Sequence, residues 1–265
     1  MKAKCLLIFI FPFYSLFADD TVDQAETLRR ELKFQEAVKL LEANRNQSLE
    51  SRNLLALLYL DLNWLGKADA IYSELCERKP SYDCYLACGS LQMKMGGYVK
   101  AENQFRKALQ IKKTSAAHSN LAVALFYQRN FTQSEEHHQK ALQISPDNIT
   151  AYTNFAIFLF TQKKYDESEI YFRNIHSADS GSFYAHLFLG RIYYIRKEYN
   201  KSLSELNQGI RINPSFFDLY YHRAAVHYRQ RNKSAALSDL NTAIRLEPLN
   251  SRAVDFRNKI RKERN

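Results

Sequence analysis

The sequence predicts an all-α protein built from repeated pairs of antiparallel helices, and two observations carry this prediction. Only 7 Gly and 5 Pro occur among 265 residues, against 17 Tyr and 17 Phe. Average usage is about 7% Gly and 5% Pro, so the residues that turn a chain are scarce. Small and apolar residues also recur at a fixed period along the chain. The composition argues against an all-β sandwich with many tight turns, and its aromatic content argues against disorder.

The first eighteen residues are typical of a secretory signal peptide. Lys2 and Lys4 precede an apolar stretch from residue 6 to 17, and Ala18 stands before two aspartates. The stretch is shorter than the roughly 20 residues that span a bilayer, although retention as a membrane anchor stays an alternative. We therefore expect an exported protein, periplasmic or secreted, with no transmembrane segment in the mature chain. The abundance of Lys, Ile, Phe and Tyr favours a bacterial envelope.

A repeat of 33 or 34 residues covers the chain after this leader. Four prolines follow the leader at separations of 66, 68 and 34 residues, namely Pro80, Pro146, Pro214 and Pro248. Internal similarity at such a period is the signature of a repeat architecture. Aligned on the prolines, a shorter first frame is followed by six full ones: 19–48, 49–81, 82–114, 115–148, 149–182, 183–216 and 217–250.

Each frame predicts two helices that cross closely. The eighth place is always small: Ala56, Gly89, Ala122, Ala156, Gly190 and Ala224. A second small residue follows twelve places later: Ala68, Ala101, Ser134, Ser168, Ser202 and Ala236. Apolar residues recur at helical spacing in both halves of each frame. Polar or glycine-bearing turns separate the halves, as at Asn63 to Lys67, and proline ends the second helix because it cannot continue the hydrogen-bond ladder.

Residues 251–265 predict a terminal capping helix. Ser251 can cap its start, and Ala253, Phe256 and Ile260 form one apolar stripe on an otherwise charged helix. This segment carries half of the excess of basic over acidic residues that remains after removal of the leader. A nucleic-acid-binding protein is expected to show a basic stripe along its body, so we expect no nucleic-acid partner.

The columns of small and apolar residues resemble the tetratricopeptide repeat (TPR). The resemblance extends over residues 19–250 and is clear in the frame 217–250, which contains Tyr220, Ala224, Ala236, Leu240, Ala243 and Pro248. Departures are Lys113 and Ser180 at the proline place and Arg223 where a bulky apolar residue is usual. The resemblance implies a right-handed superhelical solenoid that is not an enzyme. It also implies a concave groove, lined by the first helix of each repeat, that binds protein or peptide segments.

The candidate groove residues follow from the position of each residue within its repeat. The twelfth places carry Leu60, Met93, Phe126, Phe160, Tyr194 and Tyr228. Polar candidates beside them are Asn120, Asn154 and His222 at the sixth place and Arg191 at the ninth. Either these side chains hold the apolar or aromatic side chains of a partner peptide, or they pack on the next repeat. No frame supplies the Lys/Asn/Arg set with which some family members hold a C-terminal carboxylate.

The sequence contains no catalytic or metal-binding pattern. HExxH, GxSxG and phosphate-loop motifs do not occur, so we expect no cofactor and no metal. His118 and His186 take places that favour packing over metal binding. Cys76 ends one predicted helix and Cys84 begins the next, so they can form a disulfide, with buried free thiols as the alternative. The function predicted is an interaction scaffold, or alternatively an accessory subunit of an envelope enzyme, secretion or pilus-assembly machine.

Overall fold

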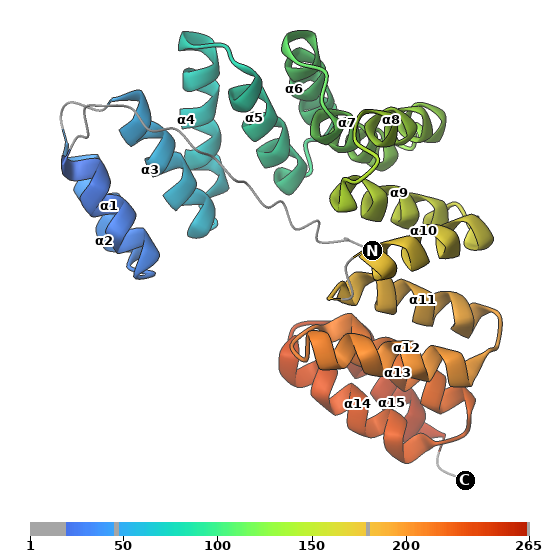
Figure 1. The fold of residues 1–265 in the computed structure, drawn as a ribbon. Helices are drawn as coiled ribbons and strands as arrows, with labels where there is room; N and C mark the ends of the chain where they lie inside the picture. The colour runs from blue at the N-terminus through green and yellow to red at the C-terminus, as the bar shows by residue number, and fades with distance from the viewer. Residues whose placement is uncertain (1–19, 45–47, 179–180, 264–265) are drawn as a thin grey trace. The chain divides into compact units, whose positions relative to one another are not determined.

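The computed structural model describes residues 20–44, 48–178 and 181–263, and each regular element in these ranges is an α-helix (Figure 1). The predicted signal peptide at 1–18 lies outside the described residues. The helices are α1 Asp20–Arg30, α2 Phe34–Ala43, α3 Leu49–Asp61, α4 Leu65–Arg78, α5 Tyr82–Met95, α6 Tyr98–Ile111, α7 Ser115–Tyr127, α8 Phe131–Ile144, α9 Ile149–Thr161, α10 Tyr165–Ala178, α11 Phe183–Ile195, α12 Tyr199–Ile212, α13 Phe217–Arg229, α14 Lys233–Leu246 and α15 Ser251–Lys262. The predicted all-α fold of antiparallel helix pairs is confirmed.

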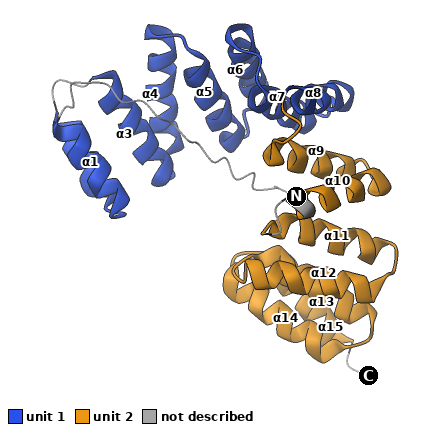
Figure 2. Ribbon diagram, in the orientation of Figure 1, with its two compact units in different colours: residues 1–144 blue, residues 145–265 orange. Residues whose placement is uncertain are grey.

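The chain divides into two compact units, residues 1–144 and residues 145–265 (Figure 2). Within each unit, every helix packs on the helix that follows it. Unit 1 contains the pairs from α1/α2 to α7/α8, and unit 2 contains the pairs from α9/α10 to α13/α14 together with α15. Among the described residues, no helix combines the length and the apolar character needed to cross a membrane.

The two helices of each pair are joined by the same left-handed turn. The turn residue has a positive φ in every pair: Leu32, Asn63, Gly96, Arg129, Lys163, Lys197 and Arg231. The next N–H then donates to a carbonyl five residues earlier, as from Lys164 to Leu159 at 2.9 Å, which caps the first helix. A left-handed conformation costs a residue other than glycine about 1–2 kcal/mol, so the packing of the pair overrides this local preference. The turn after α3 is shorter than predicted, because α4 already begins at Leu65.

The small residues lie where the two helices of a pair cross. In three repeats the second helix carries a fully buried serine whose hydroxyl donates to a carbonyl of the first helix. These bonds are Ser134 to Ala122 at 2.8 Å, Ser168 to Ala156 at 2.9 Å and Ser202 to Gly190 at 2.6 Å. A helical carbonyl has a second lone pair, so the serine bonds without breaking the helix. The crossing is therefore held by a hydrogen bond as well as by close packing.

Arg223 has a specific structural reason for replacing the usual apolar residue. Its guanidinium donates two hydrogen bonds to Asp239 of α14, at 2.8 and 2.6 Å, and one to Asn207 of α12, at 2.6 Å. Asp239 is buried, and a two-pronged contact between guanidinium and carboxylate is a strong form of ion pair. The pair therefore occupies the space between these helices that an apolar side chain fills elsewhere.

We predict that Gly89→Ala destabilises unit 1 by about 1–3 kcal/mol, the usual effect of overpacking a core. A Cβ atom at Gly89 would lie 2.4 Å from the buried ring of Phe105, far closer than van der Waals contact. The free energy of unfolding in urea measures the effect. Combining the change with Phe105→Leu should recover part of the loss. Gly66→Ala is the matched control: a Cβ there meets nothing within 4 Å, so this variant should be as stable as the wild type or up to about 1 kcal/mol more stable.

Candidate functional site

The first helices of the pairs lie next to one another in unit 2. Helix α11 contacts both α9 and α13 directly, in addition to its partner α12. Phe256 of α15 then packs against Tyr221 and Tyr228 of α13, with ring centroids 6.0 and 5.4 Å apart. We call the side of unit 2 formed by α9, α11, α13 and α15 the first-helix face. In unit 1, α1 contacts α3 and α5 contacts α7, and we call the side formed by these first helices the first-helix face of unit 1.

Phe160 is buried rather than available on this face. It is 8% exposed and packs edge-on against Phe188 and Tyr165, with centroid distances of 5.1 and 5.4 Å. The guanidinium of Arg191 lies 4.4 Å from the centre of its ring. At this repeat the twelfth-place aromatic ring therefore packs on the next helix pair, which is one of the two interpretations that the sequence left open.

The other twelfth-place side chains keep part of their surface exposed. Tyr194 accepts a hydrogen bond from Arg229 Nε at 3.1 Å, and the hydroxyl of Tyr228 donates to the carboxylate of Glu263 at 2.6 Å. In unit 1, Met93 packs against a core cluster around Phe105, and Phe126 lies edge-on to Tyr127 at 5.4 Å. The polar candidates Asn120 of α7 and Asn154 of α9 are partly exposed.

Arg191 lies partly exposed on the first-helix face of unit 2, against the buried ring of Phe188. The guanidinium carbon of Arg191 is 4.8 Å from the centre of the Phe188 ring. Burial lowers the pKa of Arg191 to about 10, so the side chain stays charged at neutral pH. Arg191 is among the residues predicted from the sequence, whereas Phe188 is not, although it holds the same sixth place as Asn120, Asn154 and His222. Aromatic residues at that place were the signal that would have found it.

Two histidines that the sequence separates by nineteen positions form a pair between α7 and α8. The Nδ1 atoms of His118 and His137 are 2.8 Å apart, and the rings stack with centroids 5.1 Å apart. One neutral imidazole donates and the other accepts, as this contact requires. Burial lowers the pKa of both, that of His137 to about 4, and it lowers the pKa of the adjacent His138 to about 3. His186, the other candidate, makes a 2.7 Å contact with Glu205 through its Nδ1.

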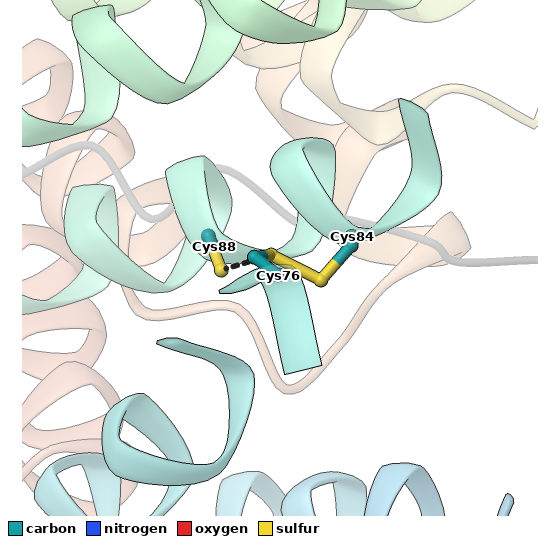
Figure 3. A group of neighbouring side chains, drawn as sticks. All are labelled: Cys76, Cys84 and Cys88. Carbon is teal, nitrogen blue, oxygen red and sulfur yellow. Dashed lines mark hydrogen bonds between the residues drawn. A yellow bond between two sulfur atoms is a disulfide. The ribbon is translucent and has the colours of Figure 1, made fainter. Parts of the chain in front are cut away.

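Cys76, Cys84 and Cys88 converge between the end of α4 and the start of α5 (Figure 3). A disulfide joins Cys76 to Cys84, whose Cα atoms are 5.6 Å apart, while Cys88 is a buried free thiol with its Sγ 3.0 Å from that of Cys76. Three sulfurs at such distances suit a soft metal, but two of them are engaged in the disulfide. Burial raises the pKa of Cys88 to about 12, so its thiol keeps its proton. In this state the cluster is a covalent link between two helix pairs.

Three family models match the chain, and together they cover just over half of it. Two of them, described as tetratricopeptide repeat, match residues 49–82 and 113–174, and one described as TPR repeat matches residues 190–230. The matched segments contain the paired helices and small-residue crossings described above. The chain belongs to the tetratricopeptide repeat family.

Solved structures share the fold at low sequence identity. A tetratricopeptide repeat protein from Parabacteroides merdae matches with a TM-score of 0.77 and 15% identity, over 92% of this chain and 98% of its own. PilW, described as a widely conserved type IV pilus biogenesis factor, matches with a TM-score of 0.68 and 18% identity, over 80% and 99%. The APC/C hetero-tetramer Cut9-Hcn1 matches with a TM-score of 0.73 and 14% identity over 92% of this chain, which spans about half (49%) of that longer chain. No curated protein matches the sequence.

We predict that reduction of the disulfide weakens unit 1. Closing a loop of this length stabilises a fold by about 2–3 kcal/mol in the chain-entropy model. The free energy of unfolding in urea should therefore fall by that amount in dithiothreitol. The double variant Cys76→Ala/Cys84→Ala should be insensitive to dithiothreitol, whereas Cys88→Ala should respond as the wild type does. An unchanged intact mass on reduction, without the gain of two hydrogens, would contradict the disulfide.

We predict that acid destabilises the α7/α8 pair before the carboxylates titrate. His137 and His138 have lower pKa values in the folded protein than the ordinary 6.5 of an unfolded chain. Their contribution is therefore complete above about pH 6.5 and is lost as the pH falls towards 4 and 3. The free energy of unfolding should drop by at least about 1 kcal/mol between pH 7.5 and 5.0, after allowance for the partial exposure of His137. His137→Gln should show a smaller drop, and an equal drop in both proteins would refute the assignment.

Proposed function

We propose that the chain is a non-enzymatic scaffold that binds segments of partner proteins on its first-helix faces. The fold is typical of modules that mediate protein–protein interaction. One observation carries the proposal for this chain: aromatic and polar side chains stand partly exposed along the first helices, among them Tyr194 and Arg191 of α11 and Tyr228 of α13. Tyrosine and arginine are enriched among the residues that dominate binding energy at protein interfaces.

The proposed repeat boundaries support the same function. Each of the seven frames from 19–48 to 217–250 contains one helix pair, and α15 follows as the capping helix. A stack of such pairs offers a preformed surface, because each pair contacts mainly its neighbours. Binding a partner segment would then require little rearrangement of the scaffold.

We further propose that the protein is exported to the bacterial envelope, in the periplasm or secreted. The support is the leader at residues 1–18, with its basic start, short apolar core and Ala18. A second candidate function is that of an accessory or recruiting subunit of a pilus-assembly or secretion machine. The likeness to PilW, which extends over 80% of this chain and 99% of PilW, favours that candidate.

Crosslinking in the native cell, followed by identification of the captured proteins, tests the proposal. We expect one or a few specific partners whose capture falls at least about tenfold with Tyr194→Ala, because truncating an interface anchor typically costs more than 1 kcal/mol. Met93→Ala is the corresponding change in unit 1. Phe160→Ala is unsuitable, because replacing a buried ring leaves a cavity and destabilises the fold.

Ile170→Ala is the matched control, because Ile170 is an exposed apolar residue on a second helix, α10. Capture that is unchanged by Tyr194→Ala and by Met93→Ala would refute binding on the first-helix faces. Partners drawn from pilus or secretion machinery would select the second candidate function.

A further inference from the structure

Arg191 is partly buried but has no polar partner among the described residues, unlike the other partly buried arginines of unit 2. Four described arginines of unit 2 are partly buried: Arg191, Arg196, Arg223 and Arg257. Three donate to side-chain oxygens on neighbouring helices: Arg196 to Asp166, Arg223 to Asp239 and Arg257 to Asn241. Arg191 makes no hydrogen bond and no ion pair with any described residue, and its close contacts are aromatic rings. Partly buried cations are normally paired, so this exception suggests a binding site.

Two phenylalanine rings hold the Arg191 guanidinium in place. Its carbon lies 4.4 Å from the centre of the Phe160 ring and 4.8 Å from that of Phe188, and these two rings are themselves in contact. The attraction of a cation to aromatic faces fixes the group without consuming its N–H donors. A guanidinium has five donors in one plane, arranged as a fork that matches a carboxylate.

The charges around Arg191 leave its positive charge without a direct counterion. Asp218 of α13 is the acidic group that acts on it electrostatically, but Asp218 is paired with Arg252 of α15 at 3.4 Å. His222 of α13 lies within the electrostatic reach of both arginines and has no hydrogen bond within the described residues. Burial, together with these two positive charges, lowers the pKa of His222, so its imidazole is neutral at pH 7 and offers one N–H donor.

We propose that Arg191 binds the carboxylate of an Asp or Glu side chain in a partner peptide. The proposal rests on the proposed function and names the chemistry of the partner. A guanidinium and a carboxylate form two parallel hydrogen bonds. The Phe160 and Phe188 rings beside Arg191 exclude water from one side of the guanidinium, which strengthens these bonds. Tyr221, which is partly exposed, would contact an apolar side chain that flanks the acidic residue, while the buried Phe188 ring supports Arg191 from below.

A carboxylate suits this site better than a phosphate does. Arg191 supplies one unpaired positive charge, His222 is neutral, and the charge of Arg252 is balanced by Asp218. A phosphate group carries close to two negative charges at neutral pH and would remain undercompensated. The site therefore matches a single negative charge beside apolar groups.

Selection of 12-residue peptides displayed on phage, with the full chain as bait, tests the proposal. Displayed peptides joined through their C-termini to the coat protein have no free terminal carboxylate, so an acidic preference reports side chains. We expect Asp and Glu next to apolar residues to be enriched with the wild type and not with Arg191→Gln. For the selected peptides, replacing Glu by Gln should weaken binding at least about tenfold to the wild type, measured by fluorescence anisotropy, and should have no effect on binding to Arg191→Gln.

Arg229→Gln is the matched control, because it removes an exposed positive charge from the same face and the Arg229 side chain bonds only to Tyr194 within the described residues. The Arg229→Gln variant should keep the preference for Glu over Gln. Arg191→Lys should lose most of it, because the ammonium group of lysine is charged but lacks the planar N–H donors that match a carboxylate. An equal loss with Arg229→Gln would assign the preference to general electrostatics and overturn the proposal.

The remaining outcomes separate this inference from the proposed function. Selected peptides without an acidic preference would overturn the carboxylate site while leaving the scaffold function supported. Failure to select any peptide, together with failure to capture partners in the cell, would refute both. Binding of a 12-nucleotide RNA that is lost with Arg191→Gln would assign the site to phosphate instead. Arg191 makes no hydrogen bond that folding requires, so Arg191→Gln should show the circular dichroism and the melting temperature of the wild type within a few degrees.

Discussion

The close crossing of the two helices within each pair is the contact that fixes the geometry of every other element. It requires a small residue on both helices at positions twelve apart, and in three repeats the buried hydroxyl of a serine also bonds to the opposite backbone, as in Ser168 to Ala156. A larger side chain at the crossing would push the helices apart, as the 2.7 Å approach of a Cβ at Gly190 to Leu206 indicates. Because the crossing recurs in register, first helices of successive pairs come into contact within a unit, as α9, α11 and α13 do in unit 2.

The crossing also explains where local rules are broken. Six of the seven turns within pairs place a residue other than glycine in the left-handed region, which is tolerated because the packed pair leaves the chain no other short connection. Arg223 replaces apolar contacts by an ion pair with the buried Asp239, between the two helices of one repeat. Cys76 and Cys84 link two successive pairs covalently. The left-handed turns, the ion pair and the disulfide each add a contact to helix pairs whose spacing the small residues determine.

Function, in this architecture, depends on what the first helices leave exposed. The repeated crossing needs only a few positions of each frame, so other positions on the first helix are free to vary without loss of the fold. Arg191 is such a position: two aromatic rings support it, and no described side chain neutralises it. A surface that combines fixed aromatic rings with an uncompensated cation suits an acidic and apolar peptide better than it suits a polyanion.

The sequence by itself determined the repeat, the two helices of each frame, the crossing places and the feasibility of a Cys76–Cys84 disulfide, because these follow from spacing within a helix or across one short turn. It did not determine which groove candidates are exposed. Phe160 and Tyr194 hold the same place in their repeats, yet Phe160 is buried under Arg191 and Phe188 of the next first helix, while Tyr194 stays partly exposed. Burial and pairing depend on side chains from other helices, as for His118 with His137, and only the tertiary structure brings those together.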